Sequence, residues 1–450
     1  MQPYPKYKST GVDWLDSIPR HWDFGRLKFS ATSRTSNVDK HTKNDEVPIR
    51  LCNYVDVYNN DFILSDMDFM AASATPAEIK SFALKKGDVL ITKDSESWDD
   101  IAVPALVASE LDEVLCGYHL SIIRSLPGMF HSGYLFRVFC SEILNYQFKV
   151  SANGVTRFGL PSSAVDSAIL PRPPIGEQQV ISDFIDSETA RIDALVETRF
   201  RLLELLEERR LAVITNWVTK GLNPNVSMKD SGINWLGQIP AHWKVKRLKF
   251  ISPKITVGIV VTPAAYYVDE GIPALRGFNI KERNLDLADL AFISEEANEL
   301  HAKSKIFAGD LVAVRTGQPG TTAVVTSDLD GANCVDLIIV RKSPEVDSRF
   351  IAFFANSDPA KLQYGTGSEG ALQQHFNIET AKSLLVPLPP LEEQMRIVDC
   401  LEAEEDRIKT ATSKMRASVD LLTEYRSALI TNAVIGKIDV RGLTKAGVAA

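Results

Sequence analysis

The chain has 450 residues with 45% hydrophobic and 24% charged side chains and a formal net charge of −8. This composition is typical of a globular protein with about three or four domains, and the acidic balance argues against binding to nucleic acid unless the basic residues gather on one face. No apolar run reaches the roughly 20 residues that a bilayer-spanning helix needs, and the first residues lack a signal-peptide core. We therefore expect a cytoplasmic protein without a membrane partner.

A segment near the start of the chain is repeated in its middle. Residues 11–29 and 232–250 are identical at 11 of 19 positions and share the motifs Trp-Leu-x-x-Ile-Pro-x-His-Trp and Arg-Leu-Lys-Phe. We expect the histidines of this box, His21 and His242, to pack rather than to catalyse. A duplicated chain predicts a pseudo-twofold internal repeat, which suits a target with two parts.

A region of short β-like runs follows each box. The runs at 87–92 and 309–314 occupy equivalent places in the two copies, as do those at 120–124 and 337–341. Between these landmarks the copies differ almost completely. We predict two α+β domains in which one framework carries two different surfaces.

A long helix is predicted after each domain. Residues 177–216 and 393–432 contain neither Pro nor Gly, and each would form a rod of roughly 60 Å. Apolar residues recur every seventh position, except at Arg199 in the first stretch, which predicts packing along a coiled-coil seam. The alternative, two core helices of an ordinary domain, does not explain why the two stretches are equivalent. The seam residues are Ile185, Ile192, Leu206, Leu401, Ile408, Met415 and Leu422.

A proline-rich stretch precedes each long helix. We expect residues 171–174 and 387–390 to be extended and not to continue a strand. Because a box follows the first helix and another opens the chain, we also expect the two termini to meet in space. The predicted segments are an N-terminal box (1–22), a first domain (23–172), a first long helix (173–221), a linker with the second box (222–243), a second domain (244–388), a second long helix (389–436) and a C-terminal tail (437–450).

The sequence carries no recognisable catalytic or cofactor motif. It has no Walker A loop and no Asn/Asp-Pro-Pro-aromatic motif. Its 5 cysteines form no Cys-x-x-Cys pair, and its 7 histidines show no ligand spacing. We therefore expect neither an enzyme nor a metal protein.

Polar loops at matching places in the two copies are the candidates for contacting nucleic acid. Arg can make two hydrogen bonds to guanine, Asn and Gln can do so to adenine, and glycines let backbone amides approach phosphates. Each of these residues alone is expected to be an ordinary surface residue. We single them out because they lie at matching places in the two copies of the repeat. The candidates are Lys93, Ser95, Asn153, Thr156, Arg157, Arg315, Thr316, Gln318, Ser368, Gln373, Gln374 and His375.

The paired boxes, together with Pro-Pro-Ile-Gly-Glu-Gln and Pro-Pro-Leu-Glu-Glu-Gln before the long helices, resemble the specificity subunit of type I restriction–modification systems. The resemblance covers essentially the whole chain. It implies two globular target-recognition domains separated by two long antiparallel helices that form a coiled-coil spacer. Each domain would read one half of a bipartite, asymmetric site in double-stranded DNA.

The resemblance also implies partners. Two methyltransferase subunits and restriction–translocase subunits would bind this chain, and S-adenosylmethionine, ATP and Mg²⁺ would be used in those partners, with no cofactor in this chain. Three alternatives remain open at this point: an adaptor for a methyltransferase without a nuclease, a coiled-coil scaffold for protein assembly, and a self-sufficient methyltransferase.

Overall fold

The computed structural model describes residues 2–365 and 376–443. The chain forms two compact units. Unit 1 contains Met1–Arg199 and Arg416–Ala450, and unit 2 contains Phe200–Met415. Both terminal segments thus belong to unit 1. In the described part of the chain, none of the helices combines the length and the apolar character needed to cross a bilayer.

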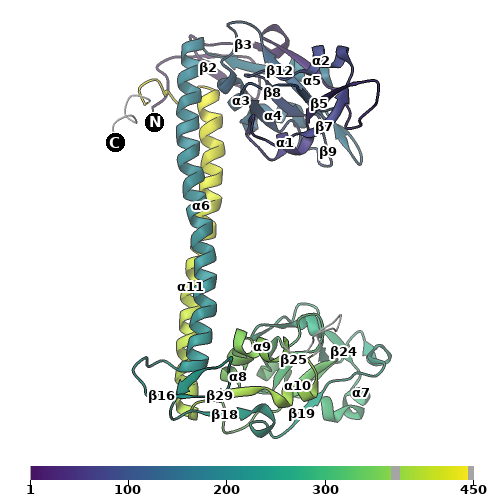
Figure 1. Cartoon of the computed structure of the whole chain (residues 1–450), viewed down its shortest axis with the longest axis vertical. Coiled ribbons are helices and arrows are strands. Elements are labelled where there is room, and N and C mark those ends of the chain that lie inside the picture. Colours follow the sequence, from purple (N-terminus) through teal and green to yellow (C-terminus); the bar gives the residue numbers. More distant parts are fainter. Residues whose placement is uncertain (1, 366–375, 444–450) are drawn as a thin grey trace. The chain divides into compact units, whose positions relative to one another are not determined.

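Unit 1 is built on a mixed sheet of five strands (Figure 1). The strand order is β4-β12-β8-β10-β6, and all four residues of β8 are buried. A second sheet, of order β11-β5-β7, packs beside it. The strands are β4 (Ala31–Thr35), β5 (Val47–Cys52), β6 (Phe62–Ile63), β7 (Met70–Ala74), β8 (Val89–Thr92), β10 (Pro104–Val107), β11 (Val114–Cys116) and β12 (Leu120–Ser125). The helices are α1 (Tyr54–Tyr58), α2 (Pro76–Phe82), α3 (Ser132–Cys140), α4 (Glu142–Lys149) and α5 (Ser162–Ser167).

Unit 2 repeats this framework with sheets and strands of different lengths. Its main sheet has the order β19-β28-β25-β26, in which β25 and β28 take the places of β8 and β12, and a second sheet has the order β20-β24-β21-β27. The strands are β19 (Ile255–Val257), β20 (Tyr267–Val268), β21 (Ile272–Leu275), β24 (Ala291–Ile293), β25 (Leu311–Val314), β26 (Thr322–Val324), β27 (Asn333–Cys334) and β28 (Leu337–Val340). A small hairpin joins β22 (Ile280–Lys281) to β23 (Asn284–Leu285), and the helices are α7 (Glu295–Leu300), α8 (Ser348–Ala355), α9 (Asp358–Gly365) and α10 (Ile378–Ser383). The predicted α+β class is therefore confirmed.

The two long helices are α6 (Ile175–Lys220) and α11 (Leu391–Val434). In unit 1 the start of α6 packs against the end of α11, where Ile185 shares a core with Leu429. In unit 2 the end of α6 packs against the start of α11, where Val218 shares a core with Leu401. The helices therefore run antiparallel, as predicted.

Burial along the predicted seam is uneven. Ile185, Ile192, Leu401 and Ile408 are at most 7% exposed. The remaining seam residues, Leu206, Met415 and Leu422, are only half-buried. Two helices alone have few neighbours with which to cover apolar side chains, so the middle parts of the helices keep apolar surface available.

A buried glutamine attaches each long helix to its domain. The Gln178 side chain accepts a hydrogen bond from the His131 amide (2.8 Å) and donates to the carbonyls of Met129 (3.0 Å) and Pro173 (2.8 Å). Gln394 does the same in unit 2, accepting from the Asp347 amide and donating to the Pro389 carbonyl, both at 2.9 Å. Removing either side chain would orphan these buried backbone groups.

The expectation that the prolines cannot continue a strand is wrong. Pro171 lies within β15 (Ile169–Arg172), which pairs with β3 (Asp23–Arg26), and Pro387 lies within β29 (Leu385–Leu388), which pairs with β18 (Lys244–Arg247). Each pair is a two-stranded sheet. A proline is tolerated there because an edge strand has one side free of ladder hydrogen bonds.

The repeated box closes each unit around a buried tryptophan. Trp22 is fully buried and donates from Nε1 to Glu177 Oε1 (3.0 Å), while His21 Nε2 lies 2.8 Å from Glu177 Oε2. In unit 2, His242 Nε2 lies 2.7 Å from Glu393 Oε2, beside the equally buried Trp243. Both histidines are thus held by the first turn of a long helix.

The terminal segments pair with each other in unit 1. The Asp439 amide donates to the Gln2 carbonyl (2.8 Å), and the Tyr7 hydroxyl donates to the Gly436 carbonyl (3.0 Å). A short antiparallel pair, β1 (Tyr7–Ser9) and β2 (Ser17–Pro19), completes this box, and β16 (Met228–Asp230) with β17 (Gln238–Pro240) is its counterpart in unit 2. The N-terminal box therefore covers the end of α11 as the second box covers the end of α6.

Gly436 gives a test of this closure. Its φ is +74°, and an added Cβ would lie 2.4 Å from Pro19 Cδ and 3.1 Å from the Trp22 ring. Gly436→Ala should lower the free energy of unfolding by about 1–2 kcal/mol for the left-handed backbone and about 1–3 kcal/mol more for the overlap, measured by urea denaturation. Gly11→Ala is the matched control, since Gly11 has φ +70° and nothing within 4 Å. Equal losses in the two variants would contradict this packing.

Candidate nucleic-acid interface

Three short strands in unit 1 bring two separate candidate segments together. The sheet has the order β13-β14-β9, with β9 (Asp94–Ser95), β13 (Asn153–Gly154) and β14 (Phe158–Gly159). The Leu160 amide donates to the Lys93 carbonyl (2.7 Å), which fixes the hairpin directly after β8. The predicted residues from 93–95 and 153–157 therefore share one surface.

The hairpin between β13 and β14 projects from this surface. Gly154 has φ +153°, and a Cβ there would lie 1.9 Å from the Arg157 carbonyl oxygen, so the turn requires glycine. Asn153 and Thr156 are exposed, and Val155 between them is 92% exposed. The tip thus offers one amide, one hydroxyl and one apolar group to a partner.

Arg157 is held at the base of this hairpin by a carboxylate. Its Nη2 lies 2.6 Å from Asp94 Oδ1, and His119 Nδ1 lies 2.8 Å from Asp94 Oδ2. The hydrogen bond to Asp94 raises the pKa of Arg157, whose side chain is still 57% exposed. The guanidinium is therefore oriented on one side and free to donate on the other.

Aromatic side chains surround this cluster. The His119 ring contacts Tyr118, with 3.7 Å between the ring centroids, and lies edge-on to Tyr54 at 6.4 Å. Tyr58 stacks on Tyr54 and donates to Asp100 (2.9 Å), which raises the pKa of Tyr58. His119 also contacts Arg157 directly, at 3.3 Å from Nη2 to Nδ1, and none of these residues was among the sequence candidates.

The other unit 1 candidates are less available. Ser95 is 7% exposed, and its hydroxyl oxygen accepts from the Ser97 amide (3.3 Å). Lys93 is half-buried. Both residues support the loop more than they face outward.

Unit 2 carries different side chains at the equivalent positions of its framework. Arg315 follows β25 as Lys93 follows β8, and it pairs with Asp336, which precedes β28 as His119 precedes β12. Thr316 and Gln318 are exposed on the turn between β25 and β26, which the hydrogen bond from the Thr321 amide to the Gln318 carbonyl (3.2 Å) closes. The remaining candidates, Ser368, Gln373, Gln374 and His375, lie outside the described residues.

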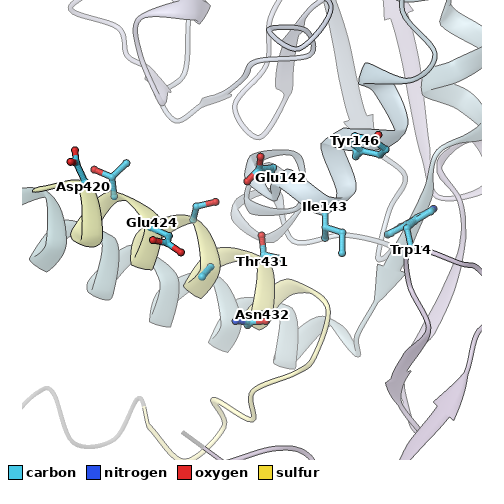
Figure 2. A pocket seen from close by; sticks show the side chains of 11 residues that line it. Trp14, Glu142, Ile143, Tyr146, Asp420, Glu424, Thr431 and Asn432 are labelled. Carbon is cyan, nitrogen blue, oxygen red and sulfur yellow. The ribbon is translucent and has the colours of Figure 1, made fainter. Parts of the chain in front are cut away.

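A groove on unit 1 lies between α4, the N-terminal box and α11 (Figure 2). Its volume is about 900 Å³, and Figure 2 shows Glu142, Ile143 and Tyr146 of α4 and Trp14 of the box beside the α11 side chains. Three carboxylates line it, from Glu142, Asp420 and Glu424. The lining therefore combines apolar and aromatic side chains with carboxylates.

Unit 2 has an equivalent groove of about 490 Å³. Asp358 opens α9 as Glu142 opens α4, and Glu208 on α6 corresponds to Glu424 on α11. The other shared pairs are Ala212 and Ala428, Thr215 and Thr431, and Asn216 and Asn432. The two copies thus retain a groove while their candidate reading surfaces differ.

Clusters of possible metal ligands are absent from the part of the chain that the structure describes. There, no three His, Cys, Asp or Glu side chains are grouped so that they could hold a metal ion. The described cysteines do not form disulfides. Burial raises the pKa of Cys140 to about 12, so this thiol is not a ready nucleophile.

A family match covers much of the second half of the chain. Residues 243–417 match the family described as the type I restriction modification DNA specificity domain. This range contains the second domain and the first part of α11.

Individual relatives agree with this match. The chain is 26% identical over 301 residues to the type I restriction enzyme EcoBI specificity subunit of Escherichia coli, an alignment that covers 64% of this chain and 63% of that protein. It is 21% identical over 435 residues to the putative type I restriction enzyme MjaX specificity subunit of Methanocaldococcus jannaschii, covering 95% of this chain and 96% of that protein. The chain is therefore similar, in its second half and over most of its length, to specificity subunits of type I restriction enzymes.

A solved structure shares the fold. It comes from work on complex assembly and conformational transition of the type I R-M system, and the match covers 94% of this chain and 99% of that chain. The TM-score is 0.71 at 18% sequence identity. At this identity the likeness shows the fold alone.

Gly154 tests whether the hairpin is part of the interface. Gly154→Ala should prevent the hairpin from closing and weaken DNA binding by the assembled complex at least tenfold, measured by fluorescence anisotropy, without changing the thermal midpoint of unfolding. Gly159→Ala is the matched control, because the nearest atom to its added Cβ lies at 3.9 Å. Equal DNA affinity in both variants would remove the hairpin from the interface.

Proposed function

We propose that this chain is the DNA-recognition subunit of a type I restriction–modification complex, with each unit reading one half of a bipartite, asymmetric DNA site. The observation that carries the proposal is the repeated framework with unlike residues at its edge. Lys93 and His119 flank the central strands in unit 1, and Arg315 and Asp336 flank them in unit 2. Two readers of the same DNA sequence would instead be expected to carry the same side chains.

The hairpin chemistry supports direct readout of bases in unit 1. A guanidinium held by a carboxylate can still make two hydrogen bonds to guanine, and Asn153 can do the same with adenine. Val155 offers an apolar contact for a thymine methyl group. Because the chain is acidic overall, with a net charge of −8, we expect base contacts to matter more here than a broad basic surface.

The repeated grooves support the docking of two copies of one partner. We propose that each groove receives a basic segment of a methyltransferase subunit. Carboxylates line both grooves, and in unit 2 Glu208 and Asp358 outnumber the one lysine, Lys220. The restriction–translocase subunits would join through this assembly. S-adenosylmethionine, ATP and Mg²⁺ would act in these partners and not in this chain, and the complex would work in the cytoplasm.

The long helices support a spacer role. They contain 46 and 44 residues and carry Arg–carboxylate pairs between them, such as Arg426–Asp193 in unit 1 (2.9 Å) and Arg209–Glu404 in unit 2 (2.8 Å). We propose that their length sets the unread gap between the two half-sites. Adding or removing helical turns would then change the gap that the complex accepts.

Exchanging one domain tests the reading function. Replacing residues 23–172 with the equivalent domain of a relative of different specificity should change one half of the methylated sequence and leave the other half intact. The measurement is methylation mapping of a genome that carries the complete system. A change in both halves together would contradict separate readers, and unchanged methylation would contradict DNA reading by unit 1.

Filling the grooves tests the docking function. Ala428→Phe and Ala212→Phe should each reduce the bound methyltransferase subunits from two to one, because each ring occupies one groove. Native mass spectrometry of the full chain with separately purified methyltransferase subunit gives the count. Ala417→Phe is the control, since Ala417 is exposed on α11 and lines neither groove. Two bound subunits in every variant would contradict docking in the grooves.

A further inference from the structure

The motif Arg-Leu-Lys-Phe ends both repeated boxes and folds the same way twice. It forms the turns η1 (Leu27–Phe29) and η2 (Leu248–Phe250), directly after β3 and β18. The leucine amide donates at 2.8 Å in both turns, from Leu27 to the Ala168 carbonyl and from Leu248 to the Leu384 carbonyl. Each leucine is at most 3% exposed and anchors its turn.

The phenylalanine of each motif points away from the core. Phe29 is 65% exposed and Phe250 is 67% exposed. The only side chain placed over each ring, among the described residues, is the preceding lysine, at 5.2 Å for Lys28 and 4.9 Å for Lys249. Packing within the chain therefore accounts for the leucine but not for the phenylalanine.

Duplication separates these two rings from ordinary exposed apolar residues. A single exposed phenylalanine is common on protein surfaces and needs no explanation. Here the same ring is exposed at equivalent positions of two units whose outer loops otherwise differ. A surface that reads different DNA halves would be expected to differ as well, so the shared ring points to something that both units meet in the same form.

The charges beside each ring narrow the choice of partner. Arg26 and Lys28 are exposed beside Phe29, and Arg247 and Lys249 are exposed beside Phe250. Within the described residues none of these four side chains takes part in an ion pair. DNA phosphates would satisfy the cations but offer no pocket for the ring. An apolar pocket with carboxylates at its rim satisfies both.

We propose that Phe29 with Arg26 and Lys28, and Phe250 with Arg247 and Lys249, form two equivalent docking knobs, each of which inserts its ring into an acid-rimmed apolar pocket on a methyltransferase subunit. This rests on the proposed function, because it assumes two such subunits. The knobs add a contact outside the grooves. Their pocket on the partner would be acidic, whereas the segment of the partner that the grooves accept would be basic.

The test compares subunit binding to the full chain and its variants. Phe29→Ala and Phe250→Ala should each weaken one of the two binding events at least tenfold, and the double variant should weaken both, measured by calorimetry with the purified methyltransferase subunit. Lys28→Glu and Lys249→Glu should act in the same direction and provide a second route should a ring variant fold poorly. Phe307→Ala is the control, since Phe307 is 43% exposed beneath Arg341 but has no equivalent in unit 1.

The outcomes separate this inference from the proposed function. If the wild-type chain binds two subunits and every variant binds them equally well, the docking knobs are contradicted and the proposed function is not. A wild-type chain that binds no methyltransferase subunit would overturn both. Variants that lose DNA affinity while keeping full subunit binding would show a phosphate-facing patch and would also overturn the pocket.

Discussion

The attachment of each long helix to its domain is the constraint on which the rest of the molecule depends. A buried glutamine amide, Gln178 or Gln394, satisfies backbone groups of both the helix start and the adjoining domain. A neighbouring glutamate, Glu177 or Glu393, holds the histidine of the repeated box. Since such buried bonds are costly to leave unmade, the helix, the domain and the box must keep one arrangement. Everything outside this attachment is free to differ between the units.

That freedom explains how one framework can carry two readers. The central strands β8 and β25 are buried throughout and have equivalent neighbours, β12 and β10 in unit 1 and β28 and β26 in unit 2, so their sequences are constrained by packing. The residues just beyond them make pairs outside the core, such as Asp94–Arg157 in unit 1 and Arg315–Asp336 in unit 2. Changing these pairs leaves the core intact, so recognition can change without loss of the fold.

The sequence predicted those parts of the structure that local pattern determines. The long stretches without Pro or Gly predicted α6 and α11, and the short apolar runs predicted β8, β12, β25 and β28. The cluster around Arg157 could be predicted only in part, because His119 and Asp94 meet it through tertiary packing that no local pattern encodes. The exposure of Phe29 could not be predicted either, since an apolar residue beside a buried leucine reads as core. The prediction that the prolines do not continue a strand was wrong for a related reason, because only the sheet topology shows that β15 and β29 are edge strands.

A circular permutant tests the central claim, that the two attachments are equivalent, most directly. The terminal segments would be joined by a short linker, and the chain would be opened between Pro224 and Asn225, after the equivalent helix end in unit 2. The measurement is the DNA sequence methylated by a complex assembled with this permutant. The expected result is the same bipartite sequence as for the native chain, because equivalent histidine–glutamate and buried glutamine contacts close the frame in both units. A folded permutant that directs methylation to a different sequence, or a permutant that cannot fold, would contradict it.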